Sequence, residues 1–183
     1  MLKINEMFNG KQPFYDSLKK DIMFKIRCCI PGIIQSYDKV NNTAEIQPSI
    51  REPYIDEEGT LTYLDLPLLI NVPIIFPSSS KFKITFPLEQ NDEVLVFFSD
   101  LSIDNFWLKG NVQNPIEFRR HDLSDGIAIP CNLSLSKVSS IEDYLTISGD
   151  NCKIQFINED IKFETRNSQI SIDEIYSYIH SEE

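Results

Sequence analysis

The apolar positions near the start of the chain follow the spacing of a helix. Phe14, Leu18, Ile22, Met23 and Ile26 recur at helical intervals, and Lys19, Lys20, Lys25 and Arg27 stand between them. This pattern predicts an N-terminal amphipathic helix within residues 1–27, over about residues 13–27. Such a helix either packs on its own domain or contacts a neighbouring subunit.

From residue 28 the pattern changes to the alternation that is typical of strands. Strands are predicted at 30–37, 43–51, within 66–77, at 81–86 and at 94–98. Prolines exclude a helix in the 66–77 segment, and the 94–98 strand is expected to be buried on both faces. Short turns without crossover helices predict an all-β, antiparallel domain over residues 28–136. Five short strands favour a small barrel such as an OB-fold.

The remaining segment, residues 137–183, has narrower strands. Alternating segments at 144–148, 152–157, 160–164 and 169–172 are separated by turn residues. Each has so few apolar residues that one chain is not expected to close a core with them. The segment is therefore either a short meander packed on the barrel or a strand ladder shared among identical chains. Residues 172–180 are expected to form a short helical cap.

Charge and cysteine content narrow the classes of function. The net charge of −11 argues against nucleic-acid binding, which needs a basic face. No apolar run is long enough for a membrane span, and the start of the chain lacks the pattern of a secretory signal. The four cysteines contain no Cys-x-x-Cys pair, which predicts buried, reduced thiols and no structural zinc.

A polar run after residue 118 is the strongest candidate for chemistry. It contains Arg119, Arg120, His121, Asp122, Ser124 and Asp125. A Ser-His-Asp triad is disfavoured because residues so close in sequence seldom reach triad geometry and no Gly-x-Ser-x-Gly elbow is present. The arginines and aspartates are more typical of an ion-pair corner. Phe106 and Trp107 could stack on single strands, but core packing is the preferred interpretation. No metal or cofactor site is expected.

Several blocks of the chain together resemble a known family. They are IQPSI (46–50), LPLLINVPIIFP (66–77), FKITFP (82–87), DEVLVFFSD (92–100), SIDNFW (102–107) and RRHDLSDG (119–126). In this order they are similar to the OB-fold N-terminal domain of central baseplate spike proteins, the membrane-puncturing proteins of contractile phage tails and R-type bacteriocins. The likeness covers about residues 28–130.

The resemblance implies a non-enzymatic homotrimer that is assembled in the bacterial cytoplasm and released as part of a tail baseplate. Its barrels would form a collar below the hub and tail tube, and its last strands would intertwine into a short trimeric β-helix or prism. Sheath contraction would then drive the spike through the target cell envelope. Structural or intersubunit contacts are expected from Trp107, Arg119, Arg120, His121, Asp122 and Asp125.

The chain also departs from this family. Its spike segment is short and lacks the His-x-His tip of some relatives, so either a separate tip protein caps it or the C-terminal helix closes it. Two alternatives remain open at this stage. One is a cell-wall hydrolase subunit of the same baseplate with catalysis around His121, and the other is an OB-fold nucleic-acid-binding module.

Overall fold

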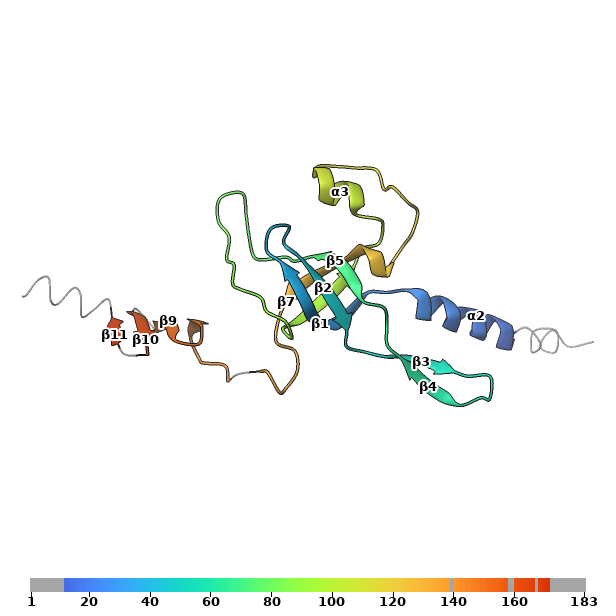
Figure 1. Ribbon diagram of the computed structural model, residues 1–183, viewed down its shortest axis with the longest axis horizontal. Coiled ribbons are helices and arrows are strands. Elements are labelled where there is room, and N and C mark those ends of the chain that lie inside the picture. The colour runs from blue at the N-terminus through green and yellow to red at the C-terminus, as the bar shows by residue number, and fades with distance from the viewer. Residues whose placement is uncertain (1–11, 139, 158–159, 167, 172–183) are drawn as a thin grey trace, which may run out of the picture. The chain divides into compact units, whose positions relative to one another are not determined.

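The computed structural model describes residues 12–138, 140–157, 160–166 and 168–171. The chain divides into two compact units, Met1–Val138 and Ser139–Glu183. The first unit begins with helix α2, Gln12–Lys25 (Figure 1). The predicted cap at 172–180 lies outside the described residues. None of the described helices is both long enough and apolar enough to span a membrane.

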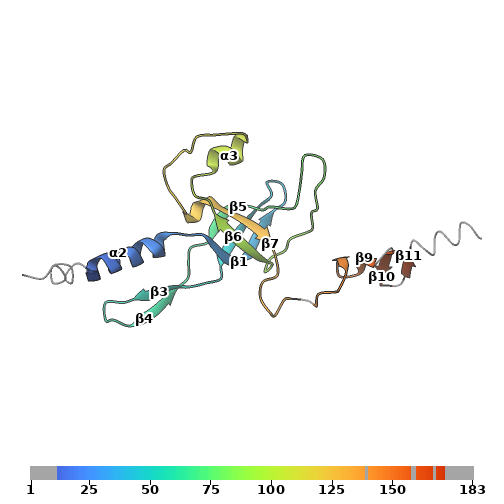
Figure 2. The same ribbon diagram turned by 180° about the vertical axis from the view of Figure 1, so that it is seen from behind.

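A curled five-stranded antiparallel sheet forms the centre of the first unit (Figure 1). Its order is β5 (Leu69–Pro73), β2 (Thr43–Pro48), β1 (Cys29–Asp38), β6 (Glu93–Phe98) and β7 (Gly126–Pro130). In the reverse view, β6 lies between β1 and β7 (Figure 2). A parallel bridge between Ile74 and Ala128 joins the two edges of the sheet, and the Ile75 amide donates to the Ala128 carbonyl over 2.8 Å. The sheet is therefore barrel-like, as the strand pattern predicts.

The core of the barrel is built from residues of the five strands and of the segment between β5 and β6. Its buried members are Ile34, Ala44, Ile46, Leu69, Val72, Ile74, Phe76, Leu88, Val94, Val96, Phe98 and Ala128. The alternation predicted for β2 is confirmed, because Ala44, Ile46 and Pro48 are buried. The prediction that 94–98 is buried on both faces is wrong, because Phe97 is 41% exposed and Leu95 is half-buried.

The fifth strand comes from a different segment than the sequence pattern indicates. Residues 81–86 alternate cleanly but make only an isolated bridge, between Ser78 and Lys83, and Phe82 is exposed. The position beside β6 is taken by β7, which follows the polar run. The register of pairing explains why β7, and not residues 81–86, is the fifth strand, since all five residues of β7 align with β6.

A separate hairpin connects β2 to β5. It consists of β3 (Glu52–Ile55) and β4 (Leu61–Leu64), which pair in an antiparallel register. The Asp56 carboxylate accepts hydrogen bonds from the backbone amides of Glu58 and Thr60. Gly59 has a φ of 81°, which glycine adopts without strain. The apolar residues of both strands are exposed.

Gly32 lies where β1 crosses β2 and β6, and it leaves no room for a side chain. A Cβ atom there would stand 2.4 Å from Cγ2 of Ile46, which is fully buried. We expect Gly32→Ala to lower the free energy of unfolding by about 1–3 kcal/mol, because the core must shift to admit the methyl group. Thermal denaturation followed by circular dichroism measures this. Gly149→Ala is the control, since its Cβ would make an ordinary contact of 3.4 Å and unfolding should change little; equal losses for both variants would contradict the packing argument.

The second unit is a four-stranded antiparallel meander. Its strands are β8 (Leu145–Ser148), β9 (Cys152–Ile157), β10 (Asp160–Thr165) and β11 (Ser168–Ser171), in the order β11-β10-β9-β8. The four strands predicted in this segment are confirmed as strands. Within the described residues they pair inside one chain, whereas a ladder shared among chains stays a prediction.

Candidate functional site

The polar run after residue 118 folds into an ion-pair corner beside two short helices, α3 (Asp104–Lys109) and η1 (Leu123–Asp125). Asp125 is fully buried and binds the Arg119 guanidinium through both oxygens, at 2.6 Å to Nε and 2.9 Å to Nη2. It also accepts a hydrogen bond of 3.0 Å from the Ile103 amide. The buried carboxylate therefore has three donors, as an ion of this kind requires.

Arg119 joins this corner to α3. Its Nη2 also donates to Oδ2 of Asp104 over 2.7 Å, and its Nη1 donates to Glu117 over 3.0 Å. The hydrogen bonds to Asp125 and then Asp104 raise the pKa of Arg119 above its ordinary value. One permanently charged side chain thus ties α3 to the segment that enters β7.

His121 lies beside this cluster and is held on both ring nitrogens. Nδ1 is 3.1 Å from the Arg27 carbonyl oxygen, and Nε2 is 3.4 Å from Oδ1 of Asp100. Its φ of 48° is a left-handed conformation that a non-glycine residue adopts where neighbours hold it. This arrangement suits a residue that fastens the chain after α2 to the loop before β7.

The other two charged residues of the run have simpler surroundings. Arg120 forms an ion pair of 2.7 Å with Asp100, and both side chains are 61% exposed. The Asp122 carboxylate accepts the Ser124 amide at the start of η1, and this bond lowers the pKa of Asp122. Asp122 is therefore a helix cap, and Arg120 is a surface partner of Asp100.

Trp107 and Phe106 do not pack in the core, and the sequence interpretation is wrong on this point. Trp107 is 45% exposed and Phe106 is 60% exposed, because α3 stands off the barrel on the long connection between β6 and β7 (Figure 1). Further exposed apolar side chains follow in the same connection. We call the set the α3 platform: Phe106, Trp107, Leu108, Val112, Ile116 and Phe118. The ion-pair corner holds one end of this platform in place.

A second polar clamp fixes the chain where it leaves the barrel. Oε2 of Glu93 accepts the amides of Leu133 and Ser134 at 2.9 and 2.8 Å, and Oε1 accepts the Ser134 hydroxyl at 2.6 Å. These hydrogen bonds, led by that from the Ser134 side chain, lower the pKa of Glu93. The sequence pattern gave no signal for this clamp, because its partners are about forty residues apart.

We expect Glu93→Gln to melt at a lower temperature than the natural chain at neutral pH, with the difference shrinking in acid. The folded pKa of Glu93 is depressed, so its contribution is present above the ordinary carboxylate range and is lost as pH falls through the folded pKa. Thermal melts from pH 7 to pH 3 test this. Glu57→Gln, at an exposed hairpin position, is the control and should show no difference; a gap that persists unchanged in acid would contradict the assignment.

The four-stranded sheet of the second unit has one apolar face and one polar face. Register partners share a face of a sheet. The pairings therefore gather Leu145, Phe156 and Ile161 in one row, and Ile147, Ile154 and Phe163 in the next. We call these six residues the apolar sheet face. The opposite face carries Thr146, Ser148, Lys153, Gln155, Lys162 and Glu164.

Among the described residues, the polar face is partly covered, whereas most of the apolar sheet face is exposed. Gln155 is buried on the polar face and donates to the Tyr144 hydroxyl over 3.0 Å, and Lys153 pairs with Glu142 at 2.9 Å. On the apolar face, by contrast, Leu145, Ile147, Phe156 and Phe163 are exposed. Such an exposed contiguous apolar surface is typical of an interaction site.

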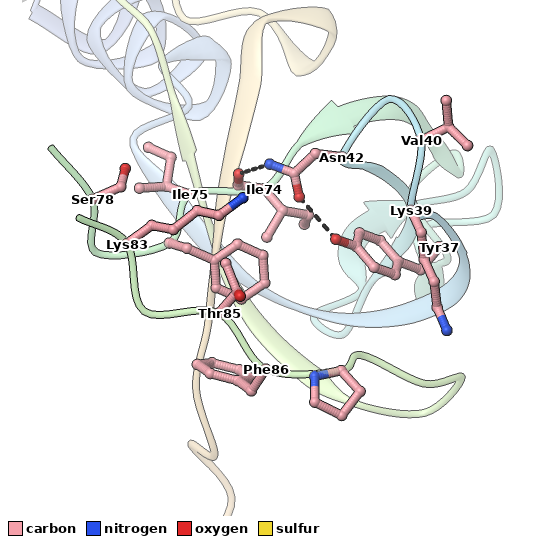
Figure 3. Close-up of a pocket in the computed structure, with 12 residues that line it drawn as sticks. Tyr37, Lys39, Val40, Asn42, Ile74, Ile75, Ser78, Lys83, Thr85 and Phe86 are labelled. Atoms are coloured by element: carbon pink, nitrogen blue, oxygen red, sulfur yellow. Dashed lines mark hydrogen bonds between the residues drawn. The ribbon is translucent and has the colours of Figure 1, made fainter. Parts of the chain in front are cut away.

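A pocket of about 730 Å³ opens between the β1–β2 turn and the segment after β5 (Figure 3). Lys39 and Lys83 lie on its wall. The Tyr37 hydroxyl donates to Asn42, whose side-chain amide donates to the Ile74 carbonyl, each over 2.8 Å. The polar groups of Tyr37, Asn42 and Ile74 therefore bind one another and form a structural wall of the pocket.

The cysteines differ from their prediction. Cys28, Cys29 and Cys152 are exposed free thiols, and Cys131 is half-buried with a pKa raised by burial. The prediction of buried thiols is wrong, because Cys28 precedes β1, Cys29 is the first residue of β1 and Cys152 is the first residue of β9, all at exposed strand ends. Within the described ranges, no three His, Cys, Asp or Glu residues are grouped to hold a metal ion.

The first unit thus has a curled, barrel-like antiparallel sheet with an ion-pair corner and an exposed α3 platform, and the second unit has an exposed apolar sheet face. The model of the family described as phage protein Gp138 N-terminal domain matches residues 30–131, which covers the barrel and the corner. The chain therefore belongs to this phage protein family. A search among curated proteins found no match.

Proposed function

We propose that the protein is the central spike of a contractile tail baseplate, in a phage or a phage-tail-like bacteriocin, and that it acts as a homotrimer. Membership in a phage protein family supports a role in the virion. The single observation that carries the trimer is the apolar sheet face. A one-layer sheet with one exposed apolar side needs another layer to bury it.

Three copies of this sheet would satisfy that need. Each sheet supplies one wall of a triangular prism, and the apolar sheet faces point inward to form a shared core. The polar faces then point outward, where Lys153, Lys162 and Glu164 meet solvent. The resulting prism is short and stiff, which suits a part that transmits force along its axis.

The barrel supports the collar part of the proposal. Its strand order, with an antiparallel sheet closed by the Ile74–Ala128 bridge, supports an OB-type barrel. The collar would plug the end of the tail tube, and the α3 platform would face the neighbouring copies or the hub proteins. Trp107 then contributes an intersubunit contact, and the residues from Arg119 to Asp125 hold the platform that presents it.

The proposed mechanism is mechanical and includes no catalytic residue. Contraction of the sheath would push the trimer through the target envelope, and the spike would need only stiffness and a narrow cross-section. The structural contacts of His121 support this view, because both ring nitrogens already face other groups of the corner. Purified protein should leave the turbidity of a peptidoglycan suspension unchanged. Clearing that His121→Ala abolishes would instead establish the hydrolase alternative.

Electron microscopy of assembled particles tests the location. Particles labelled with a gold-conjugated antibody against the chain should carry gold at the end of the tail tube, below the baseplate. Label on the head or along the sheath would overturn the proposal. Particles assembled without this chain are the control for the specificity of the antibody.

A further inference from the structure

The β3–β4 hairpin and helix α2 of the first unit each expose an apolar face. In the β3–β4 hairpin, Pro53 pairs with Tyr63 and Ile55 pairs with Leu61, so these four residues share one face. All four are exposed. In helix α2, Phe14, Leu18 and Ile22 recur at the spacing of one helix face and are also exposed.

Neither element has the size to be stable by itself. A two-stranded hairpin is marginal in water, and so is an isolated helix of 14 residues. Each therefore gains stability by burying its apolar face on another surface.

Charge distinguishes these two surfaces further. Residues 52–65 of the hairpin contain five acidic and no basic residues, whereas residues 11–27 contain five basic and two acidic ones. Glu57 and Glu58 are exposed at the hairpin tip, and Lys19 and Lys25 are exposed on the helix. The apolar faces can therefore meet with basic side chains of the helix beside acidic side chains of the hairpin.

The chain's own helix is within reach of its hairpin but does not cover it. The Arg27 guanidinium, just after α2, binds the Glu52 carboxylate at the base of the hairpin over 3.0 Å. Despite this tie, Ile55, Leu61 and Ile22 are all exposed. Among the residues that the structure describes, none buries either of these two apolar faces.

We infer that α2 of one copy docks on the β3–β4 hairpin of the neighbouring copy. This inference rests on the proposed trimer, in which three identical head-to-tail contacts close a ring. Each chain then gives a helix to one neighbour and receives a helix from the other. The contact would lock the three barrels into a collar, independently of the prism formed by the apolar sheet faces.

Cysteine cross-linking in the full chain tests this contact. Cys28, Cys29, Cys131 and Cys152 are first replaced by serine, and light scattering must show that this background keeps the mass of the natural protein. Ile22→Cys and Tyr63→Cys are then added together. Upon oxidation we expect covalent dimers and trimers on a non-reducing denaturing gel, with more than half of the chains linked.

Mixing separates a contact between chains from one within a chain. Co-assembly of an Ile22→Cys chain with a Tyr63→Cys chain should give a covalent dimer of the two. The matched control pairs Ile22→Cys with Val40→Cys, an exposed position on the β1–β2 turn, and should give no such dimer.

The outcomes separate the inference from the function on which it rests. A faster-migrating monomer that contains an internal disulfide would show that the helix docks on its own hairpin. Absence of any cross-link in a background that is still trimeric would also overturn the inference, but it would not contradict the proposed function as a trimeric spike. A monomeric background whose natural parent is also monomeric would overturn both.

Discussion

Ile147→Glu is expected to dissociate the proposed trimer into monomers. Ile147 lies on the apolar sheet face, on the edge strand β8, in register with Ile154 and through it with Phe163, and it is 53% exposed in the single chain. In the prism its side chain would be buried against two other copies. Burial of an unpaired carboxylate raises the free energy of the assembled state by several kcal/mol for each ion. About 1.4 kcal/mol corresponds to a factor of ten in the association equilibrium constant. Three such charges on one axis would shift the equilibrium to monomers, which sedimentation velocity measures.

The adjacent residue provides a matched control for this prediction. Ser148 belongs to the same strand but lies on the opposite, polar face, in register with Lys153. Ser148→Glu adds the same charge, so it should leave the sedimentation coefficient of the trimer unchanged. If both variants dissociated, charge alone would explain the result. If neither did, the apolar sheet face would not be the trimer contact.

Asp125→Ala is expected to have the largest effect on the stability of the barrel. The substitution removes the buried partner of the Arg119 guanidinium and leaves the Ile103 amide without its acceptor. Loss of one member of a buried ion pair costs about 3 kcal/mol or more. For a chain of this size we therefore expect the melting temperature to fall by roughly 10 °C. Differential scanning calorimetry measures this directly.

Arg120 supplies the comparison within the same loop. It is adjacent to Arg119 and also pairs with an aspartate, but both partners are mostly exposed. Exposed ion pairs contribute about 0–1 kcal/mol to the free energy of unfolding. Arg120→Ala should thus melt within about 2 °C of the natural chain. Similar decreases in melting temperature for Asp125→Ala and Arg120→Ala would show that burial of an ion pair does not determine its contribution to the stability of the barrel.

The barrel illustrates which parts of a fold a single sequence predicts. The strands β1, β2, β5 and β6 alternate or carry dense apolar residues, so periodicity located them. The 81–86 segment alternates as well, yet β7 occupies the strand position, because pairing partners are chosen by tertiary contacts that no local pattern records. β7 has only five residues and follows a polar run, so the sequence pattern did not predict it as a strand.

The candidate site shows a similar division. An ion-pair corner was expected from the residue types between Arg119 and Asp125, and the structure places Arg119 on Asp125. The exposed positions of Phe106 and Trp107 were not predictable, since aromatic residues are usually buried and their loop is held by contacts from distant segments. Asp104 and Glu93 were missed for the same reason, because their partners lie far away in sequence.

The mass of the intact chain in solution tests the central claim most directly. Size-exclusion chromatography with multi-angle light scattering, at micromolar concentrations and neutral pH, should give three times the chain mass of 21.2 kDa. The same mass should persist on tenfold dilution, because the shared core of the prism is apolar. A mass of a single chain across this range would contradict the trimeric spike.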